Sequence, residues 1–227
     1  MIKVRYIDLF CGIGGFRLGV EKVAPEYSLH PECVFSSDID PYARQAYAAN
    51  FGETPTGDIT KVPATAIPDH DLLLGGFPCL PFSIIGEGKG FAGTRGTLFF
   101  EIARILEAKR PKAFILENVK QLRSHRQGRT LARILEALNS LGYAVDTRVL
   151  NALHYGLPHK RERLFIVGYH KAALFEWPAP CKEFAPLSSI LQANVPKTFY
   201  ASPAIARKRN ATHKPKSIPS IWHENKS

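Results

Sequence analysis

Apolar segments alternate with stretches of helical periodicity over most of the chain, up to about residue 168. The apolar segments are short and rich in Val, Ile, Leu and Phe, as strands are, whereas the stretches between them repeat apolar residues at the spacing of a helix face. This alternation is typical of a mainly parallel sheet covered by helices, so we expect an α/β fold. The predicted strands are VRYIDLF (4–10), CVFSS (33–37), DLLLGG (71–76), KAFILE (112–117), AVDTRVL (144–150) and LFIVGY (164–169).

Three of the intervening stretches predict amphipathic helices, namely PYARQAYAANF, TLFFEIARILEAKR and TLARILEALNSLG, the last ending at a glycine as helices commonly do. The pattern changes near Trp177: no glycine occurs after Gly168, and seven of the 17 prolines lie in the final fifty residues. Proline-rich stretches without periodicity are typical of linkers. We therefore predict a domain over residues 1–180, followed by a basic, proline-containing segment over residues 181–227.

Composition narrows the class of protein. The 227 residues are 45% hydrophobic and carry a net charge of +10, which favours a polyanionic partner, although the residues from Lys197 onward supply +6 of that charge. The sequence has no apolar run of about 18 residues and no signal-peptide pattern at its N-terminus, so we expect no membrane span and a cytoplasmic protein. The four cysteines have no paired spacing, and we expect neither a disulfide nor a metal site.

A glycine-rich turn follows the first predicted strand, in YIDLFCGIGGFRLG. Gly12, Gly14 and Gly15 allow the backbone to approach a ligand closely, although such a turn is also compatible with a simple tight bend. It is not a GxGxxG turn, so a dinucleotide with a pyrophosphate is not the natural ligand. Asp38 stands at the tip of the second strand, where folds of this type bind a ribose diol, and Asp40 is suited to cap the following helix.

Asp58, in the loop GDIT, has two interpretations. It is suited to accept a hydrogen bond from an adenine amino group, and it is equally a common type of turn residue. Glycines, then an acid, then a second acid at successive strand ends indicate a ligand that contains adenosine but no phosphate chain. S-adenosylmethionine fits that description.

Cys79 follows the third predicted strand, in GGFPCLPFS. A free cysteine is most often a small buried apolar residue. Here, however, it stands at a strand end, where open α/β sheets bind ligands, and Pro78 and Pro81 restrict the bend around it. A thiol in that position is a candidate nucleophile if its pKa is lowered.

Charged residues mark two later strands. Glu117 ends the otherwise apolar strand in FILENV, where an unused and unpaired carboxylate would be costly. Arg161 and Arg163 stand at the start of the last predicted strand, on one side of it if the chain is extended there, with Glu162 on the other side. Two arginines on one side suit a phosphate and a carbonyl or carboxylate, and a solvated edge strand is the competing interpretation.

In combination these motifs are far more specific than they are singly. DLFCGIGGFRLG, GGFPCLPFS, LENV and GLPHKRERLFIVGY, in this order, closely resemble the DNA (cytosine-5)-methyltransferase family, over about residues 4–170. The resemblance implies a Rossmann-like, doubly wound sheet of the S-adenosylmethionine-dependent type, mostly parallel with an antiparallel strand near the C-terminal end of the sheet. It also implies S-adenosylmethionine as cofactor and double-stranded DNA as partner, as in restriction-modification systems.

The resemblance assigns roles by matched position. Cys79 corresponds to the nucleophile and Glu117 to the acid that faces the cytosine ring. Arg163 corresponds to the arginine that contacts the base, Arg161 to a neighbour nearer the backbone phosphates, and Asn118 belongs to the same catalytic group. The implied cofactor site comprises Phe10, Gly12, Ile13, Gly14, Gly15, Asp38, Ile39, Asp58, Ile59, Pro78 and Leu98.

The implied chemistry explains the cysteine. Cytosine C5 is a poor nucleophile, so a thiolate first adds at C6, while an acid at N3 absorbs the developing negative charge. C5 of the resulting enamine then attacks the sulfonium methyl group, and loss of the C5 proton expels the cysteine. Since a stacked base offers no access for these steps, the cytosine has to be flipped out of the duplex.

Two departures from the family pattern matter. Leu80 replaces a glutamine that commonly follows the nucleophile, which removes a polar contact from the loop that meets DNA. PSIWHENKS resembles only the first residues of the family's target-recognition region, and neither the rest of that region nor the final motif follows it in this sequence.

Three hypotheses follow from the second departure. The first is the catalytic part of a split methyltransferase, with a second polypeptide supplying recognition and the final motif. The others are a truncated, inactive remnant and a cofactor-binding module. RNA cytosine is a less favoured substrate, and the target sequence cannot be read from these residues.

Overall fold

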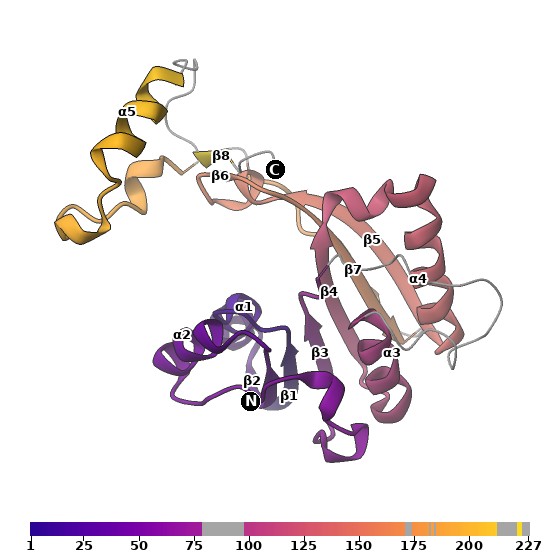
Figure 1. Cartoon of the computed structure of the whole chain (residues 1–227). Coiled ribbons are helices and arrows are strands. Elements are labelled where there is room, and N and C mark those ends of the chain that lie inside the picture. The colour runs from indigo at the N-terminus through magenta and orange to yellow at the C-terminus, as the bar shows by residue number, and fades with distance from the viewer. Residues whose placement is uncertain (79–97, 171–173, 182, 184, 213–221, 224–227) are drawn as a thin grey trace. The chain divides into compact units, whose positions relative to one another are not determined.

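The computed structural model describes residues 1–78, 98–170, 174–181, 183, 185–212 and 222–223 (Figure 1). Within them, six strands form the main sheet, in the order β2-β1-β3-β4-β7-β5. These strands are β1 (Ile2–Leu9), β2 (Leu29–Ser37), β3 (Leu72–Gly75), β4 (Ala113–Val119), β5 (Tyr143–Asn151) and β7 (Glu162–His170). The helices packed on them are α1 (Gly15–Val23), α2 (Pro41–Phe51), α3 (Leu98–Lys109) and α4 (Arg129–Ser140).

The sheet is mostly parallel. β1 pairs in parallel with β2 and β3, and β3 pairs in parallel with β4. β7 instead runs antiparallel to β4, with Arg163 opposite Val119 and Tyr169 opposite Ala113. The predicted fold class, including its antiparallel strand, is confirmed.

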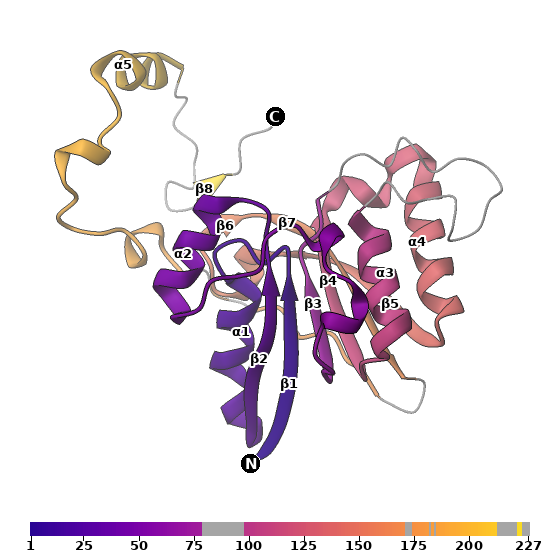
Figure 2. The ribbon, with the colours of Figure 1, turned by 60° about the horizontal axis from the view of Figure 1, so that its bottom comes forward.

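Different helices cover the two faces of the sheet, as Figures 1 and 2 show. On one face, α3 and α4 bury an apolar core that includes Ile7 and Leu9 of β1. On the other face, Tyr6 of β1 donates a hydrogen bond to Glu21 of α1 at 3.2 Å. Because neighbouring side chains of a strand point to opposite faces, β1 separates an apolar layer from a polar one.

The apolar face of α3 explains its attachment to the sheet. Phe99, Ile102, Ala103, Ile105 and Leu106 are buried, at the three- and four-residue spacing of one helix face. Burying a large apolar side chain contributes roughly 1.5–3 kcal/mol relative to leaving it exposed, so this face alone holds α3 against the strands.

Helix α2 begins after a capping aspartate and ends at a glycine, which are common helix boundaries. The Asp40 carboxylate accepts hydrogen bonds from the N–H groups of Tyr42 at 2.8 Å and Ala43 at 3.4 Å. At the other end Gly52 has a φ of 74° and donates to the Ala48 carbonyl at 2.8 Å. The interpretation of Asp40 as a helix cap is confirmed; such caps contribute about 1 kcal/mol.

Strand β2 is longer than predicted, because it begins at Leu29 rather than at Cys33. Residues 30–32 interrupt the apolar pattern, yet they pair in parallel with residues 3–5 of β1. β2 is an edge strand, where a proline and charged side chains are tolerated because one side of the backbone makes no ladder. Side-chain pattern therefore underestimates its length.

By its internal contacts the chain forms two compact units, residues 1–149 with 163–175 and residues 150–162 with 176–227. The second unit contains helix α5 (Pro203–Thr212) and a short parallel pair of β6 (His159–Lys160) with β8 (Trp222–His223). The domain boundary near residue 180 stays a prediction. No helix in the described ranges is long and apolar enough to cross a bilayer.

Because β7 packs closely against β4, a single methyl group added at their contact is expected to destabilise the fold. A Cβ added at Gly168 would overlap the buried ring of Phe114, which itself packs edge-on against Tyr143. We expect Gly168→Ala to lower the free energy of unfolding by about 1–3 kcal/mol, as overpacking does. Urea unfolding followed by near-ultraviolet circular dichroism measures the change.

Gly19→Ala is the matched control for that substitution. A Cβ at this exposed position of α1 meets no atom within 4 Å, so alanine is expected to stabilise the helix by about 0.5–1 kcal/mol. Equal effects of the two substitutions would contradict the packing described for Gly168.

Candidate active site

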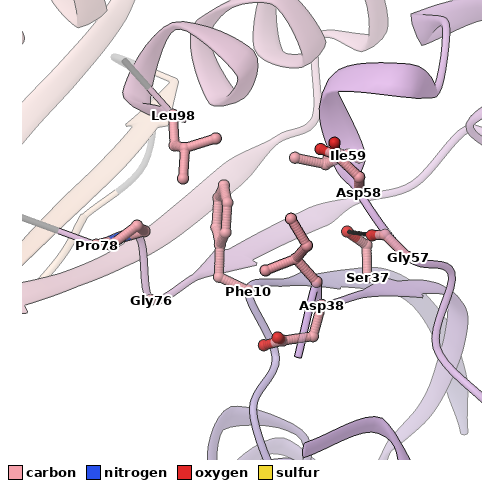
Figure 3. A pocket seen from close by; sticks show the side chains of 10 residues that line it. Phe10, Ser37, Asp38, Gly57, Asp58, Ile59, Gly76, Pro78 and Leu98 are labelled. Atoms are coloured by element: carbon pink, nitrogen blue, oxygen red, sulfur yellow. Dashed lines mark hydrogen bonds between the residues drawn. The ribbon is translucent and has the colours of Figure 1, made fainter. Parts of the chain in front are cut away.

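A cavity of about 280 Å³ lies at the carboxyl ends of β1, β2 and β3 (Figure 3). Open α/β sheets bind their ligands at this edge. Seven of the ten lining residues belong to the cofactor site that the sequence implied, and Ser37, Gly57 and Gly76 were not anticipated. The seven are Phe10, Asp38, Ile39, Asp58, Ile59, Pro78 and Leu98.

Phe10 occupies the middle of the cavity. Its ring projects between Pro78 and Leu98 on one side and Asp58 and Ile59 on the other (Figure 3). Its backbone has a φ of 55°, a left-handed conformation that is uncommon for a bulky residue. Such conformations persist where the surroundings impose them, and here the ring lies within the cavity.

Asp38 ties two strand ends together. One carboxylate oxygen accepts a hydrogen bond from the Gly12 N–H at 2.8 Å, and the other accepts from the Asp40 N–H at 2.9 Å. An ionised carboxylate has about four acceptor positions, so two remain for the hydroxyl groups of a ribose. The geometry is compatible with the diol-binding role expected of this residue.

The structure confirms the turn interpretation of Asp58. The residue caps the short helix η2 (Ile59–Lys61): its Oδ1 accepts from the Thr60 N–H at 3.0 Å and from the Thr60 hydroxyl at 2.7 Å. These bonds hold the pKa of the Asp58 carboxyl below its usual value. Asp58 also lines the cavity, and its contact with an adenine amino group stays a prediction.

The glycine turn lies beside the cavity rather than in its lining. Gly14 has a φ of 94°, and a Cβ there would overlap the ring of Phe51, so only glycine fits this position. Asn50 donates to the Ile13 carbonyl at 3.2 Å. Helix α2 therefore fixes the turn from outside, while Gly15 begins α1.

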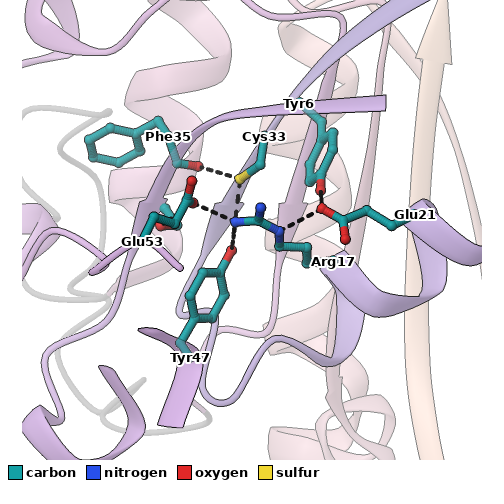
Figure 4. Close-up of polar contacts among 8 residues, drawn as sticks. Tyr6, Arg17, Glu21, Cys33, Phe35, Tyr47 and Glu53 are labelled. Atoms are coloured by element: carbon teal, nitrogen blue, oxygen red, sulfur yellow. Dashed lines mark hydrogen bonds and ion pairs between the residues drawn. The ribbon is translucent and has the colours of Figure 1, made fainter. Parts of the chain in front are cut away.

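A charged network fastens α1 beneath that turn (Figure 4). The Arg17 side chain is 11% exposed and donates to Glu21 at 2.7 Å, to Glu53 at 2.5 Å and to the Tyr47 hydroxyl at 3.3 Å. Its guanidinium also lies 4.4 Å from the centre of the Phe51 ring. A nearly buried cation with two carboxylate partners is costly to disturb, because either partner's loss leaves a charge without compensation.

Asp8 lies in the same polar layer, on β1, and is completely buried. Burial raises the pKa of its carboxyl to about 8, a rise that the positive charge of Arg17 opposes and the negative charge of Asp38 favours. The sequence prediction missed both Asp8 and Arg17. A charged residue inside an apolar strand motif, as in YIDLF, was the available signal.

A second group of charges lies next to the cavity. Arg163 Nε and Glu117 Oε1 are 2.9 Å apart, and both side chains are largely shielded from solvent, at 12% and 23% exposed. A Cβ added at Gly76, in the cavity lining, would lie 3.7 Å from Glu117 Oε2. The structure thus brings two of the predicted catalytic residues together at the edge of the cofactor cavity.

Asn118 is buried and faces the polypeptide instead of the cavity. Its amide donates to the Phe77 carbonyl at 2.8 Å, and its oxygen accepts from the Val119 N–H at 2.9 Å. It therefore fixes the backbone at Phe77, and its catalytic role stays a prediction.

The remaining residues singled out in the sequence are described separately. Arg161 precedes β7 and lies in the second unit, where its N–H donates to Asn151 Oδ1 at 3.1 Å. Cys79 and Leu80 lie outside the described residues. Their roles stay predictions.

A doubly wound sheet with a glycine turn after β1 and an acid after β2 is typical of folds that bind nucleoside-containing cofactors at this edge. The comparisons identify the family within that class. The model of the C-5 cytosine-specific DNA methylase family matches residues 4–223. The chain belongs to this family, whose members are S-adenosylmethionine-dependent methyltransferases.

Individual relatives agree with the family model. The chain is 53% identical to the type II methyltransferase M.NgoBI of Neisseria gonorrhoeae over 97% of its own length and 69% of that protein. It is 51% identical to M.HaeII of Haemophilus aegyptius over 99% of its length and 70% of that protein. Among solved structures, the Dnmt2 methyltransferase of S. pombe has the same fold, with a TM-score of 0.72 at 19% identity over 96% of this chain and 69% of that one.

The contacts of Asp38 predict its contribution to cofactor binding. We expect Asp38→Ala to raise the dissociation constant for S-adenosylmethionine roughly 10- to 100-fold, since hydrogen bonds to a charged group contribute about 1.5–3 kcal/mol. Isothermal titration calorimetry measures the constant. Asp69→Ala, an exposed acid before β3, is the control, and an unchanged constant in the Asp38 variant would remove that residue from the site.

The buried Asp8 carboxyl predicts a pH dependence of stability. An unfolded aspartate loses its proton near pH 3.9, whereas the folded one keeps it to about pH 8. Between these values the folded state binds more protons, so this group makes the free energy of unfolding fall as pH rises, and the fall ends above about pH 8.

Asp8→Asn removes this titration. The variant's stability relative to the native chain should therefore increase from about pH 5 to about pH 8 and then level off, as measured by urea unfolding. Glu26→Gln, at an exposed position, is the control. A difference between Asp8→Asn and the native chain that does not vary with pH would contradict the raised pKa.

Proposed function

We propose that the chain transfers a methyl group from S-adenosylmethionine to C5 of a flipped-out cytosine in DNA, through a covalent adduct on Cys79. One observation carries the proposal: the Glu117–Arg163 pair adjoins a cavity lined by the residues expected to hold the cofactor, in a member of this family. The type II methyltransferase names of its relatives favour a role in restriction-modification.

The cavity residues fit the cofactor by their chemistry. The Phe10 ring offers a face for adenine, Asp38 offers acceptors for the ribose hydroxyls, and Asp58 offers an acceptor for the adenine amino group. Among the described residues, the lining contains no lysine or arginine, which suits a ligand without phosphates. When bound, S-adenosylmethionine supplies a methyl group on a positively charged sulfur.

Three side chains of the protein then act on the base in different ways. The Cys79 thiolate forms a bond to C6, and a proton shared between Glu117 and N3 stabilises the electrons that move into the ring. Arg163 holds the Glu117 carboxyl in place and contributes positive charge beside the base. C5 takes the methyl group, whose bond to the sulfonium sulfur breaks and leaves S-adenosylhomocysteine. Water accepts the C5 proton, and the electrons of that C–H bond restore the C5–C6 double bond and expel Cys79 as a thiolate.

The described cysteines support the choice of Cys79. Burial raises the pKa of the Cys11 thiol far above its usual value and that of Cys33 to about 11. Since the thiolate is the nucleophile, neither is suited to attack a base near neutral pH. Cys181 is exposed and lies in the second unit.

We further propose that the catalytic domain occupies residues 1–180 and that residues 181–227 begin the part that reads the target sequence. The chain spans 69% and 70% of M.NgoBI and M.HaeII, and the rest of those proteins has no counterpart in the alignment. Base readout needs dedicated side chains in a groove, so specificity depends on that part.

Methyl transfer from labelled S-adenosylmethionine to cytosine-containing duplex DNA tests the function. The chain is assayed alone and with a polypeptide corresponding to the remaining third of M.HaeII. Transfer is expected in the mixture. No transfer by correctly folded protein in either assay would contradict the proposal and leave a remnant or a cofactor-binding module.

Cys79→Ser tests the nucleophile in the same assay. We expect transfer to be abolished, because a hydroxyl does not ionise near neutral pH, while the dissociation constant for S-adenosylmethionine stays unchanged. Cys181→Ser, at an exposed cysteine, should keep full activity. Equal activity of the native chain and Cys79→Ser would refute the assignment.

A further inference from the structure

A strongly basic segment follows the strand that carries Glu117. Between Lys120 and Arg133 the sequence has five Lys or Arg residues and no Asp or Glu. The segment comprises the short helices η6 (Lys120–Arg123) and η7 (His125–Gly128) and the first turns of α4. We call residues 120–133 the basic segment.

Apolar and polar contacts fix the backbone of the basic segment. Leu122 is completely buried, and Leu131 is buried in the core beneath α4. His125 and the buried Thr130 hydroxyl are 2.7 Å apart and join η7 to α4. The segment is therefore an ordered part of the first unit and not a loose loop.

The same backbone turns three arginines outward. Arg123, Arg126 and Arg129 are all exposed, and Arg129 donates to the Gln127 side chain at 3.0 Å. Arg126 and Gln127 have left-handed φ angles of 50° and 61°, which are costly for residues other than glycine. Such strain concentrates at functional sites, where the surroundings enforce it.

The basic segment begins close to the proposed catalytic groups. β4 ends at Val119, two residues after Glu117, and Lys120 begins the segment immediately afterwards (Figure 1). The carboxyl end of β4 also lies beside Gly76 in the cavity lining. A base bound at Glu117 therefore brings its own strand close to this row of arginines.

The surface chemistry favours phosphate over a protein partner. No large apolar side chain is exposed between Lys120 and Arg133, whereas the centres of protein interfaces are apolar and aromatic. Arginines pair with phosphate oxygens by two parallel hydrogen bonds, and contacts of this kind set the position of a protein on a duplex.

We propose that the basic segment binds the phosphate backbone of duplex DNA next to the flipped cytosine, chiefly through Arg123, Arg126 and Arg129. This inference rests on the proposed function and adds a binding surface to it. The surface contributes affinity that is independent of base sequence.

The salt dependence of DNA binding tests the proposal. The affinity of the chain for a cytosine-containing duplex is measured by fluorescence anisotropy at several salt concentrations. For the triple variant Arg123→Gln, Arg126→Gln, Arg129→Gln, we expect weaker binding and a slope of log K against log salt that is smaller by about 2 to 3, since each phosphate contact contributes about 0.9. Circular dichroism and S-adenosylmethionine binding check that the variant is folded.

A variant of equal charge change is the control. Lys3→Gln, Lys22→Gln, Lys112→Gln removes three exposed cations near the amino end of the sheet, where Lys3 and Lys112 make only surface ion pairs. Its slope should stay within about one unit of the native value. Equal losses of slope in the two variants would overturn the proposal, because net charge alone would then explain binding.

Parallel assays separate this inference from the proposed function. If the native chain transfers methyl groups but the slope of the triple arginine variant is unchanged, the proposed role of the basic segment is overturned and the proposed function stands. A reduced slope without methyl transfer supports duplex binding and counts against the proposed reaction. The proposal is also overturned if the triple arginine variant loses affinity for single-stranded RNA but not for duplex DNA.

Discussion

The reversed direction of β7 is the constraint on which the candidate active site depends. β7 runs antiparallel to β4, so its first residues lie beside the last residues of β4, and Arg163 comes opposite Val119. In an all-parallel sheet the start of β7 would lie at the opposite edge, and Arg163 would be a strand's length from Glu117. Because β7 is reversed, Arg163 Nε lies 2.9 Å from the partly buried Glu117 carboxylate. Without this cation, burial of the Glu117 carboxylate would be unfavourable. One strand reversal thus creates the charge pair that the proposed chemistry needs.

The two faces of the sheet are stabilised by different kinds of contact, and this has consequences for the cofactor side. α3 and α4 are held by an apolar core, which tolerates changes of side chain if volume is conserved. α1 is joined to β1 by the hydrogen bond from Tyr6 to Glu21, and to α2 and the residue after Gly52 by the contacts of Arg17 with Tyr47 and Glu53, all of which are directional. Because the glycine turn begins α1, directional contacts are well suited to fix the position of its N–H groups.

The sequence predicted the strands, the three principal helices and most of the cavity lining, since these depend on local pattern and on short motifs. The sequence was less informative about features that depend on tertiary contacts. Residues 30–32 look polar but extend β2, because the backbone of β1 pairs with them. Asp8 and Arg17 appear within strand and helix motifs, and only the folded chain puts the carboxyl in a buried layer and surrounds the guanidinium with acids. Arg161 and Arg163 look equivalent in sequence, yet they fall in different units.

Gly76 lies at the end of β3, between the proposed cofactor site and the proposed base site. A Cβ at this position would lie 3.7 Å from Glu117 Oε2 and 3.8 Å from the Phe10 carbonyl oxygen, so its backbone separates the two groups by a single van der Waals layer. In methyl transfer the attacking carbon and the methyl donor have to approach within roughly 3–3.5 Å. A larger side chain at residue 76 would stand between them. In the proposed reaction, glycine at residue 76 keeps open the space between the two ligands.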